Sequence, residues 1–298
     1  PRQRRVPRRL VGGFHQLEVD QDTVLELKSL LKVVPGKRFV PLDATRYIAL
    51  SRSLRRRLQE IGQLSEYQGT SVKIPAHSAL VLEDLEHEVG QFIPDQNWSR
   101  RRKTIQEALD SAPSPPSTLK AELRDYQVAG YQWLSRLARM GFGACLADDM
   151  GLGKTLQALA LVVERAPQGP SLVVAPTSVC SNWLTESRRF APTLQPIMYC
   201  GRDRASALDQ VGPFCLVICS YALLMQDADI LSAVFWNSLV LDEAQAIKNW
   251  SAKRTQAAMG LQAGFCLATT GTPLENNLNE LWSLFRFLNP GLLGPRKR

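Results

Sequence analysis

The chain has 298 residues, a length that suits one large domain or two ordinary ones. Hydrophobic residues make up 45% and charged residues 21%, a balance that supports a packed core and excludes bulk disorder. No apolar run approaches the roughly 18 residues of a membrane span, and the arginine-rich start lacks the apolar segment of a signal peptide. We therefore expect a cytoplasmic protein with no membrane contact.

The formal net charge of +8 is carried by the two ends of the chain. Residues 1–9 hold five arginines and no acid, and residues 296–298 read Arg-Lys-Arg. The remaining residues, 10–295, carry 28 basic and 28 acidic side chains. A basic chain suggests a nucleic acid partner, but here the body of the protein is neutral, so net charge does not locate a binding surface.

The cysteines and histidines do not form a zinc pattern. The six cysteines have irregular spacing with no Cys-x-x-Cys pair, and the three histidines lie near none of them in a ligand-like order. We expect scattered buried thiols in a reducing compartment.

A Pro/Ser stretch, Ser111–Ser117, marks the clearest boundary, because it cannot continue a helix or a central strand. The sequence thus predicts an accessory domain at 1–112, a linker at 113–118 and a second domain at 119–298. We expect the accessory domain to be small and α+β, with a protein partner as one possible role. It contains no catalytic constellation.

Local patterns predict several elements in the accessory domain. They are a hairpin of Phe39–Leu42 and Tyr47–Leu50, a helix capped by Ser51 and running through Ile61, an extended segment over Ser71–Leu82, and a basic helix over Ser99–Leu109. The arginine runs at 55–57 and 100–103 could contact phosphates, although charge runs on helices are usually solvated faces.

After the linker, short apolar strands alternate with helices. This pattern predicts an α/β domain with a central, mostly parallel sheet covered on both faces, and ligands at the carboxyl ends of its strands. The predicted strands are 144–147, 172–175, 196–200, 214–219, 239–241 and 265–268, and the predicted helices include 126–140, 154–165, 179–190 and 277–288.

The first of these strands ends in Asp148-Asp-Met-Gly-Leu-Gly-Lys-Thr155, directly before a helix. Gly151 and Gly153 allow a tight turn whose N–H groups approach phosphate oxygens. Lys154 would place its charge on the β/γ phosphates, and the Thr155 hydroxyl would ligate Mg²⁺. The order of strand, Gly-Lys-Thr and helix predicts a P-loop for ATP, although Asp148 stands where the general pattern has glycine.

A second strand delivers Asp242 and Glu243 to its tip. Asp242 can hold Mg²⁺ through water, and Glu243 can orient or deprotonate the attacking water. An isolated Asp-Glu pair is more often a helix start, but a P-loop upstream on the same predicted sheet favours a hydrolytic site.

These residues resemble the Swi/Snf-type ATPases of helicase superfamily two. Leu123-Arg-Asp-Tyr-Gln127, with Gly130 and Trp133, is similar to the adenine-reading motif of that family. The resemblance covers residues 119–293 and implies a RecA-like P-loop lobe. It assigns nucleotide contacts to Gln127, Arg124, Met150, Gly151, Leu152, Gly153, Lys154 and Thr155.

Further segments resemble the family's DNA-path and coupling motifs. They are Val173–Pro176 with Trp183, Ser220–Leu223, Asp242-Glu-Ala-Gln245 with Ile247–Asn249, and Thr270-Gly-Thr-Pro-Leu274 with Asn276, Leu281, Trp282 and Leu284. The resemblance assigns contact with DNA, or its coupling to hydrolysis, to Pro176, Thr177, Ser220, Tyr221, Lys248, Asn249, Thr270, Gly271 and Thr272.

The resemblance implies a motor that moves along double-stranded DNA by hydrolysing Mg·ATP, without necessarily separating strands. It also implies a second RecA-like lobe carrying an arginine for the transferred phosphate. Because the sequence stops shortly after Asn289–Gly294, we expect a fragment that binds nucleotide weakly and hydrolyses it poorly. Two alternatives stay open: an RNA helicase of the same superfamily, and a non-catalytic binding module that acts through residues 1–112.

Overall fold

A computed structural model describes residues 10–11, 17–20, 23–25, 39–41, 47–64, 66–68, 71–75, 96–272 and 278–293. The chain forms two compact units, one of Pro1–Glu107 with Gly291–Arg298 and the other of Ala108–Pro290. Each unit is described by itself.

The described part of the first unit contains short antiparallel strands. β4 (Phe39–Pro41) pairs with β5 (Tyr47–Ala49), which confirms the predicted hairpin. A three-stranded sheet has the order β1-β7-β6 and consists of β1 (Leu10–Val11), β7 (Ser71–Pro75) and β6 (Glu66–Gln68). A further pair is formed by β2 (Leu17–Asp20) and β3 (Thr23–Leu25). The predicted extended segment is therefore a strand through Pro75, and residues 76–82 lie outside the described residues.

Two helices accompany these strands. α2 (Arg52–Leu64) begins after Ser51, whose Oγ accepts a hydrogen bond from Leu54 N at 3.0 Å, so the predicted cap is confirmed. α4 (Gln96–Asp110) confirms the basic helix and is longer than predicted. Antiparallel pairs with separate helices correspond to the expected α+β character.

The second unit is built on a six-stranded parallel sheet in the order β10-β11-β9-β12-β13-β8. All six predicted strands are present, and every pairing among them is parallel. Their bounds are β8 (Ala144–Leu146), β9 (Ser171–Ala175), β10 (Gln195–Met198), β11 (Cys215–Ser220), β12 (Phe235–Leu241) and β13 (Gln262–Thr269).

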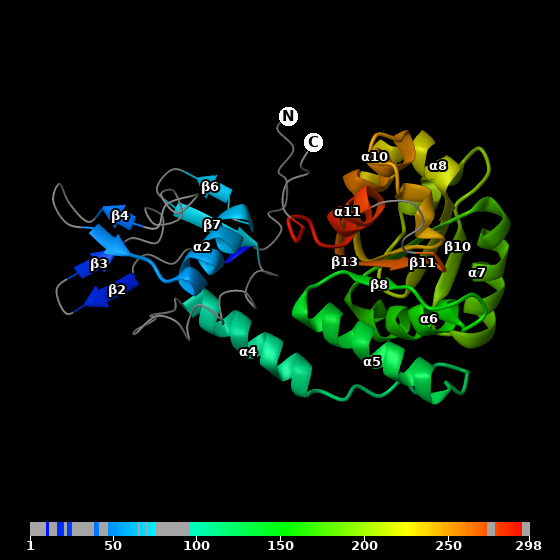
Figure 1. The fold of residues 1–298 in the computed structure, drawn as a ribbon. Coiled ribbons are helices and arrows are strands. Elements are labelled where there is room, and N and C mark those ends of the chain that lie inside the picture. Colours follow the sequence, from blue (N-terminus) through cyan, green and yellow to red (C-terminus); the bar gives the residue numbers. More distant parts are fainter. Residues whose placement is uncertain are drawn as a thin grey trace. The chain divides into compact units, whose positions relative to one another are not determined.

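Helices cover both faces of this sheet (Figure 1). Val173 of β9 packs on the face covered by α5 (Asp125–Met140), α6 (Lys154–Arg165) and α7 (Thr177–Phe190), while Val174 packs on the opposite face. That second face is covered by α8 (Tyr221–Gln226), α9 (Ala228–Ala233), α10 (Lys253–Gly260) and α11 (Leu278–Leu288). Burial on both faces explains why the strand sequences are almost continuously apolar.

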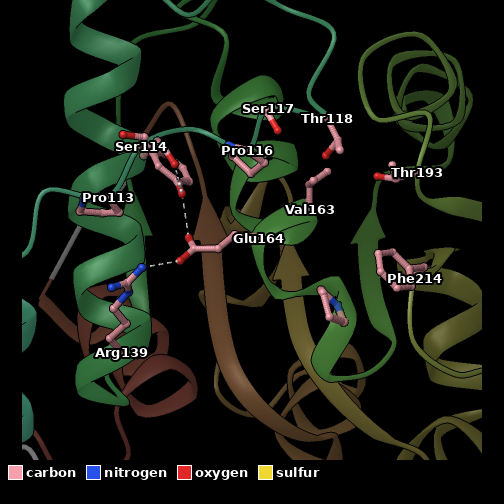
Figure 2. Close-up of a pocket in the computed structure, with 12 residues that line it drawn as sticks. Pro113, Ser114, Pro116, Ser117, Thr118, Arg139, Val163, Glu164, Thr193 and Phe214 are labelled. Atoms are coloured by element: carbon pink, nitrogen blue, oxygen red, sulfur yellow. Dashed lines mark hydrogen bonds and ion pairs between the residues drawn. The ribbon is translucent and has the colours of Figure 1, made fainter.

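The Pro/Ser stretch, Ser111–Ser117, is part of the second unit and bonds to its helix α5. Arg136 of α5 donates from Nε to Ser111 O at 2.8 Å, and the Tyr131 hydroxyl donates to Ser114 O at 3.0 Å. Ser114 and Tyr131 border a cavity of about 440 Å³. Figure 2 shows its lining, where Arg139 forms an ion pair with Glu164 at 3.0 Å. The predicted limits of the linker at 113 and 118 stay a prediction, since the compact unit begins at Ala108.

None of the helices in the described residues is long and apolar enough to cross a membrane. All six cysteines are free thiols. Within the same part of the chain, no group of three or more His, Cys, Asp or Glu side chains is arranged to hold a metal ion.

Candidate functional site

The P-loop lies between the end of β8 and the start of α6. Gly151 and Gly153 have φ values of 84° and 72°, in the left-handed region that glycine adopts most easily. No side chain caps the start of α6, so this helix end offers N–H groups and the positive end of its dipole to an anion. A Cβ at Gly151 would meet nothing within 4 Å, so the loop is open on that side.

The ammonium of Lys154 lies within the P-loop. Its Nζ donates to the backbone oxygens of Asp148 at 2.8 Å and Asp149 at 3.0 Å. The carboxylate of Asp148 accepts from Gln157 Nε2 at 3.3 Å, so the residue that departs from the general P-loop pattern ties the loop to α6. The positive charge is thus placed among backbone oxygens at the predicted phosphate site.

Gln127 links the start of α5 to the P-loop. Its Oε1 accepts from Arg124 N at 3.0 Å, and its Nε2 donates to Leu152 O at 3.2 Å. A Cβ at Gly153 would collide with the Gln127 amide, so both the conformation and the close approach require glycine. The structure therefore brings Gln127, Arg124 and Leu152 together, whereas Met150 of the P-loop is 77% exposed.

A cavity of about 660 Å³ adjoins the P-loop. Tyr126 and Trp133 of α5 are 41% and 42% exposed, an unusual exposure for large aromatic side chains. Burial raises the pKa of the Cys145 thiol at this cavity to about 11, so the thiol stays protonated. The lining is Tyr126, Gly130, Trp133, Cys145, Leu146, Ala147, Asp148 and Leu152.

Asp242 follows β12 and its side chain is held by three donors. Oδ2 accepts from Trp183 Nε1 at 2.8 Å, and Oδ1 accepts from Glu243 N at 3.0 Å and from the Thr269 hydroxyl. The residue is only 9% exposed. Buried carboxylates are stable when hydrogen bonds satisfy them, and these bonds fix the direction of this one.

A chain of hydrogen bonds leads from Glu243 to the residues after β13. Gln245 Nε2 donates to Glu243 Oε2 at 2.7 Å, and the Thr270 hydroxyl donates to Gln245 Oε1 at 3.0 Å. The same hydroxyl accepts from Thr272 N at 3.1 Å. Glu243 has φ 48°, a left-handed conformation that is uncommon for a residue with a side chain. We call these four residues the Glu243 relay.

The strand order brings the two halves of the site together. β13 lies between β12 and β8, and at its end Thr269 bonds Asp242 while Thr270 N donates to Leu146 O at 3.1 Å. The donor set also fits the expected cofactor, because Mg²⁺ takes one or two protein oxygens and completes its shell with water and phosphate. The Thr155 hydroxyl and the Asp242 carboxylate supply oxygens of this kind.

The residues assigned to DNA or coupling divide into two groups. Thr177, Asn249 and Thr272 are exposed. Ser220, Tyr221, Lys248 and Thr270 are buried or partly buried: Ser220 Oγ accepts from Leu223 N at 3.3 Å as the cap of α8, and Lys248 forms an ion pair with Glu280 at 3.4 Å. The side chains of the second group therefore bond within the protein. Pro176 is half-buried at the start of α7, and Gly271 is half-buried beside Met150.

Two relationships were missed by the sequence analysis. The contact of Trp183 with Asp242 was not predicted, because spacing does not show which way a helical side chain points. Arg286 lies over the rings of Trp250 and Trp282 at 4.8 and 5.2 Å, and the two rings meet edge to face at 5.5 Å. The four-residue spacing of Trp282 and Arg286 on one predicted helix was a signal for this cluster.

Comparison with known proteins identifies this arrangement. The model of the SNF2-related domain family matches residues 126–298. A putative ATP-dependent helicase/translocase of Bacillus subtilis, YwqA, is 44% identical in an alignment of 201 residues that covers 65% of this chain. The helicase SWR1 of Saccharomyces cerevisiae is 38% identical in an alignment of 221 residues that covers 67% of this chain.

A solved structure gives the same result for the fold. The Sulfolobus solfataricus SWI2/SNF2 ATPase core in complex with dsDNA is 42% identical, matches with a TM-score of 0.57 and covers 62% of this chain. The expected RecA-like lobe is thereby confirmed. The chain spans 22% of YwqA, 15% of SWR1 and 39% of the Sulfolobus chain. Because the family model matches more than half of the chain, and the P-loop and the Asp242 strand meet at one edge of its sheet, this protein belongs to the SNF2-related domain family.

Proposed function

We propose that residues 108–290 form the Mg·ATP-binding lobe of a DNA-dependent ATPase that moves along double-stranded DNA. The observation that carries the proposal is the meeting of the P-loop and the Asp242 strand at one edge of the sheet, joined through Thr269 and Thr270. Ligands of open α/β sheets bind at this edge.

Each residue has a role in this proposal. Gly151, Gly153 and the start of α6 bind phosphates, and Lys154 neutralises them. Thr155 and Asp242 hold Mg²⁺, the latter through water, and the metal neutralises charge on the phosphates. Glu243 orients the attacking water, and the Glu243 relay sets its position.

The base has a natural place beside the P-loop. Gln127 already contacts Leu152 O, and the adjoining cavity offers the aromatic faces of Tyr126 and Trp133. A ring system stacks well on such side chains. Gln127 and Arg124 would then read the edge of adenine, with Met150 and Leu152 beside it.

A second RecA-like lobe is the expected partner for catalysis. In related nucleotide hydrolases an arginine that stabilises the transferred phosphate is worth about a thousand-fold or more in rate. We therefore expect residues 1–298 by themselves to bind nucleotide and to hydrolyse it slowly, and to gain activity when a separately made second lobe is added. A protein partner for residues 1–112 is a further proposal.

Duplex DNA is favoured over RNA as the track. The Sulfolobus core that resembles this chain was solved with dsDNA, whereas the alternative of an RNA helicase has no such support. We expect this chain to bind duplex DNA with little sequence preference, because phosphate contacts position a protein without specifying a sequence.

The decisive experiment is direct nucleotide binding. Lys154→Ala should weaken binding of a fluorescent ATP analogue by tenfold or more, which corresponds to about 1.4 kcal/mol. Lys253→Ala is the matched control, because Lys253 is an exposed lysine at the start of α10. Equal affinities of the two variants for the ATP analogue would contradict the proposal. In a separate assay of ATP hydrolysis, stronger stimulation by single-stranded RNA than by duplex DNA would favour the RNA helicase alternative.

A further inference from the structure

Two buried aromatic side chains converge on Asp242 from the two segments that follow β9 and β11. Trp183 donates its indole N–H to the carboxylate at 2.8 Å, and the Tyr221 hydroxyl donates to the backbone oxygen of Asp242 at 2.9 Å. Trp183 is fully buried and Tyr221 is 7% exposed. Neither side chain is placed to touch DNA, although the resemblance includes Trp183 in a DNA-path motif and assigns Tyr221 itself to DNA contact or coupling.

The segment that follows β9 contains helix α7. This helix begins at exposed Thr177, directly after half-buried Pro176. Cys180 Sγ lies 3.4 Å from Pro176 O and 3.8 Å from Ala175 O, so the first turn is held to the end of β9. Trp183 stands on the same helix, so a displacement of its first turn would move the indole N–H relative to Asp242.

The segment that follows β11 contains helix α8. Ser220 ends β11 and caps this helix, and Tyr221 is its first residue. Because Tyr221 is only 7% exposed, the bond from its hydroxyl to the backbone oxygen of Asp242 is shielded from water.

The bonds on Asp242 leave room for a metal-bound water. A carboxylate accepts about four hydrogen bonds, and this one accepts three, from Trp183, Thr269 and Glu243 N. Loss of the indole donor would free Oδ2 and let the carboxylate turn about its bond to Cβ. Groups that orient a metal-binding residue typically change metal affinity by 10–100-fold when removed.

We propose that Trp183 and Tyr221 are positioning residues for Asp242, and that they transmit the arrangement of the segments after β9 and β11 to the Mg²⁺ site. This inference rests on the proposed function, because it assigns Mg²⁺ to Asp242. It adds a physical link between the expected DNA-binding segments and the metal that does not pass through the Glu243 relay.

The test compares the Mg²⁺ concentration required for binding of a fluorescent ATP analogue in four single variants. Trp183→Phe and Tyr221→Phe each remove one donor to Asp242. Trp236→Phe and Tyr199→Phe are matched controls, because these residues are equally buried and donate instead to Leu231 O at 3.0 Å and to Asp227 at 3.0 Å. Thermal unfolding of all four shows how much stability each substitution removes.

We expect Trp183→Phe to raise the Mg²⁺ midpoint, the Mg²⁺ concentration that gives half-maximal binding of the ATP analogue, about 10-fold or more. Tyr221→Phe should raise it by a smaller factor, because the Tyr221 hydroxyl bonds the backbone of Asp242 and not its carboxylate. The controls should stay within about twofold, and affinity measured in EDTA should be the same in all variants. Equal midpoints in Trp183→Phe and Trp236→Phe would overturn the inference and leave the proposed function standing.

A second readout follows the link directly. The indole N–H signal of Trp183, assigned in ¹⁵N–¹H spectra by its absence in Trp183→Phe, should shift when Mg·ADP is added and again when duplex DNA is added. The Trp236 signal should not respond. If the chain binds Mg·ADP but the Trp183 signal does not shift, the inference is contradicted. If the chain binds no nucleotide, the proposed function is overturned and this inference with it.

Discussion

The side-chain oxygen of Gln157 occupies the space that a Cβ atom on Gly130 would need. Gly130 lies in the interior of α5, where glycine is a poor helix former. Gln157 is fully buried in α6, and its Nε2 donates to Asp148 of the P-loop at 3.3 Å. The position of the buried Gln157 amide therefore depends on the absence of a methyl group at residue 130.

Gly130→Ala should consequently lower the free energy of unfolding by about 1–3 kcal/mol, as overpacking of a core does. In a Gln157→Ala background the same substitution should raise it by about 0.5–1 kcal/mol, because only the helix preference of alanine remains. Urea denaturation of the double-mutant cycle measures both values. Gly260→Ala is the control, since a Cβ at that position meets nothing within 4 Å. Additive effects at positions 130 and 157 would contradict the prediction.

Thr270→Val removes the hydroxyl at the centre of the Glu243 relay while keeping a β-branched side chain. Thr270 is 1% exposed and its hydroxyl bonds both Gln245 and Thr272 N. We expect turnover of ATP in the presence of duplex DNA to fall by about tenfold, equivalent to about 1.4 kcal/mol, with nucleotide affinity unchanged. Thr270→Ser should restore turnover, because it restores the hydroxyl. A valine variant with normal turnover would show that the relay does not act on Glu243.

The bonds among Tyr199, Arg204 and Asp227 predict a stability change at each end of the pH scale. Burial, together with the bond to Asp227, raises the pKa of Tyr199 to about 12. This tyrosine ionises near pH 10 in an unfolded chain, so its stabilising contribution is complete below about pH 10 and is lost as the pH rises to about 12. The difference in unfolding free energy between wild type and Tyr199→Phe should therefore shrink over that interval.

At acid pH, stability changes with pH in the opposite direction, because the group concerned is a carboxylate. Hydrogen bonds from Arg204 lower the pKa of Asp227 below its ordinary value. The contribution of Asp227 is present above about pH 3.9, the ordinary value, and is lost as the pH falls through the lowered pKa. Asp227→Asn should abolish this loss, and urea titrations from pH 5 downward measure it. Parallel pH curves for wild type and Asp227→Asn would contradict the assignment.

The salt dependence of duplex binding separates the charged ends from the neutral body. Each neutralised phosphate contributes about −0.9 to the slope of log affinity against log salt. A chain without residues 1–9 and 296–298, which carry the whole net charge of +8, should retain a shallow slope. The intact chain serves as the reference, and fluorescence anisotropy at several salt concentrations gives both slopes. A steep slope in the shortened chain would locate the phosphate contacts in the body instead.

The strands were predictable because their sequences have a simple physical origin. β9 and β11 are buried at every position, so they appear as unbroken apolar runs. β12 begins earlier than predicted, at Phe235, because Asn237 and Ser238 are buried but polar and interrupt the apolar run. β13 begins earlier, at Gln262, because its first three residues are exposed or partly exposed and lack that signal. The short helices α8, α9 and α10 were not named in advance, since runs of six to eight residues carry little periodicity.

The site was predictable where chemistry fixes the residue type, and less so where packing fixes the direction. Gly151, Gly153 and Lys154 follow from what a phosphate requires, and the structure gives both glycines the left-handed backbone. The inward direction of Trp183 and Tyr221 depends on how two helices pack on the sheet. Of the predicted coupling segment, Pro273, Leu274 and Asn276 lie outside the described residues.

The backbone conformation of Glu243 lowers the stability of the folded protein, although its side chain is proposed to serve ATP hydrolysis. A non-glycine residue in the left-handed region is destabilised by about 1 kcal/mol or more, and Glu243 adopts that conformation at φ 48°. Glycine at this position would relax the backbone and raise the melting temperature, yet it would remove the carboxylate that is proposed to orient water. Selection of variants for thermal stability alone should therefore favour substitutions at Glu243 that abolish turnover.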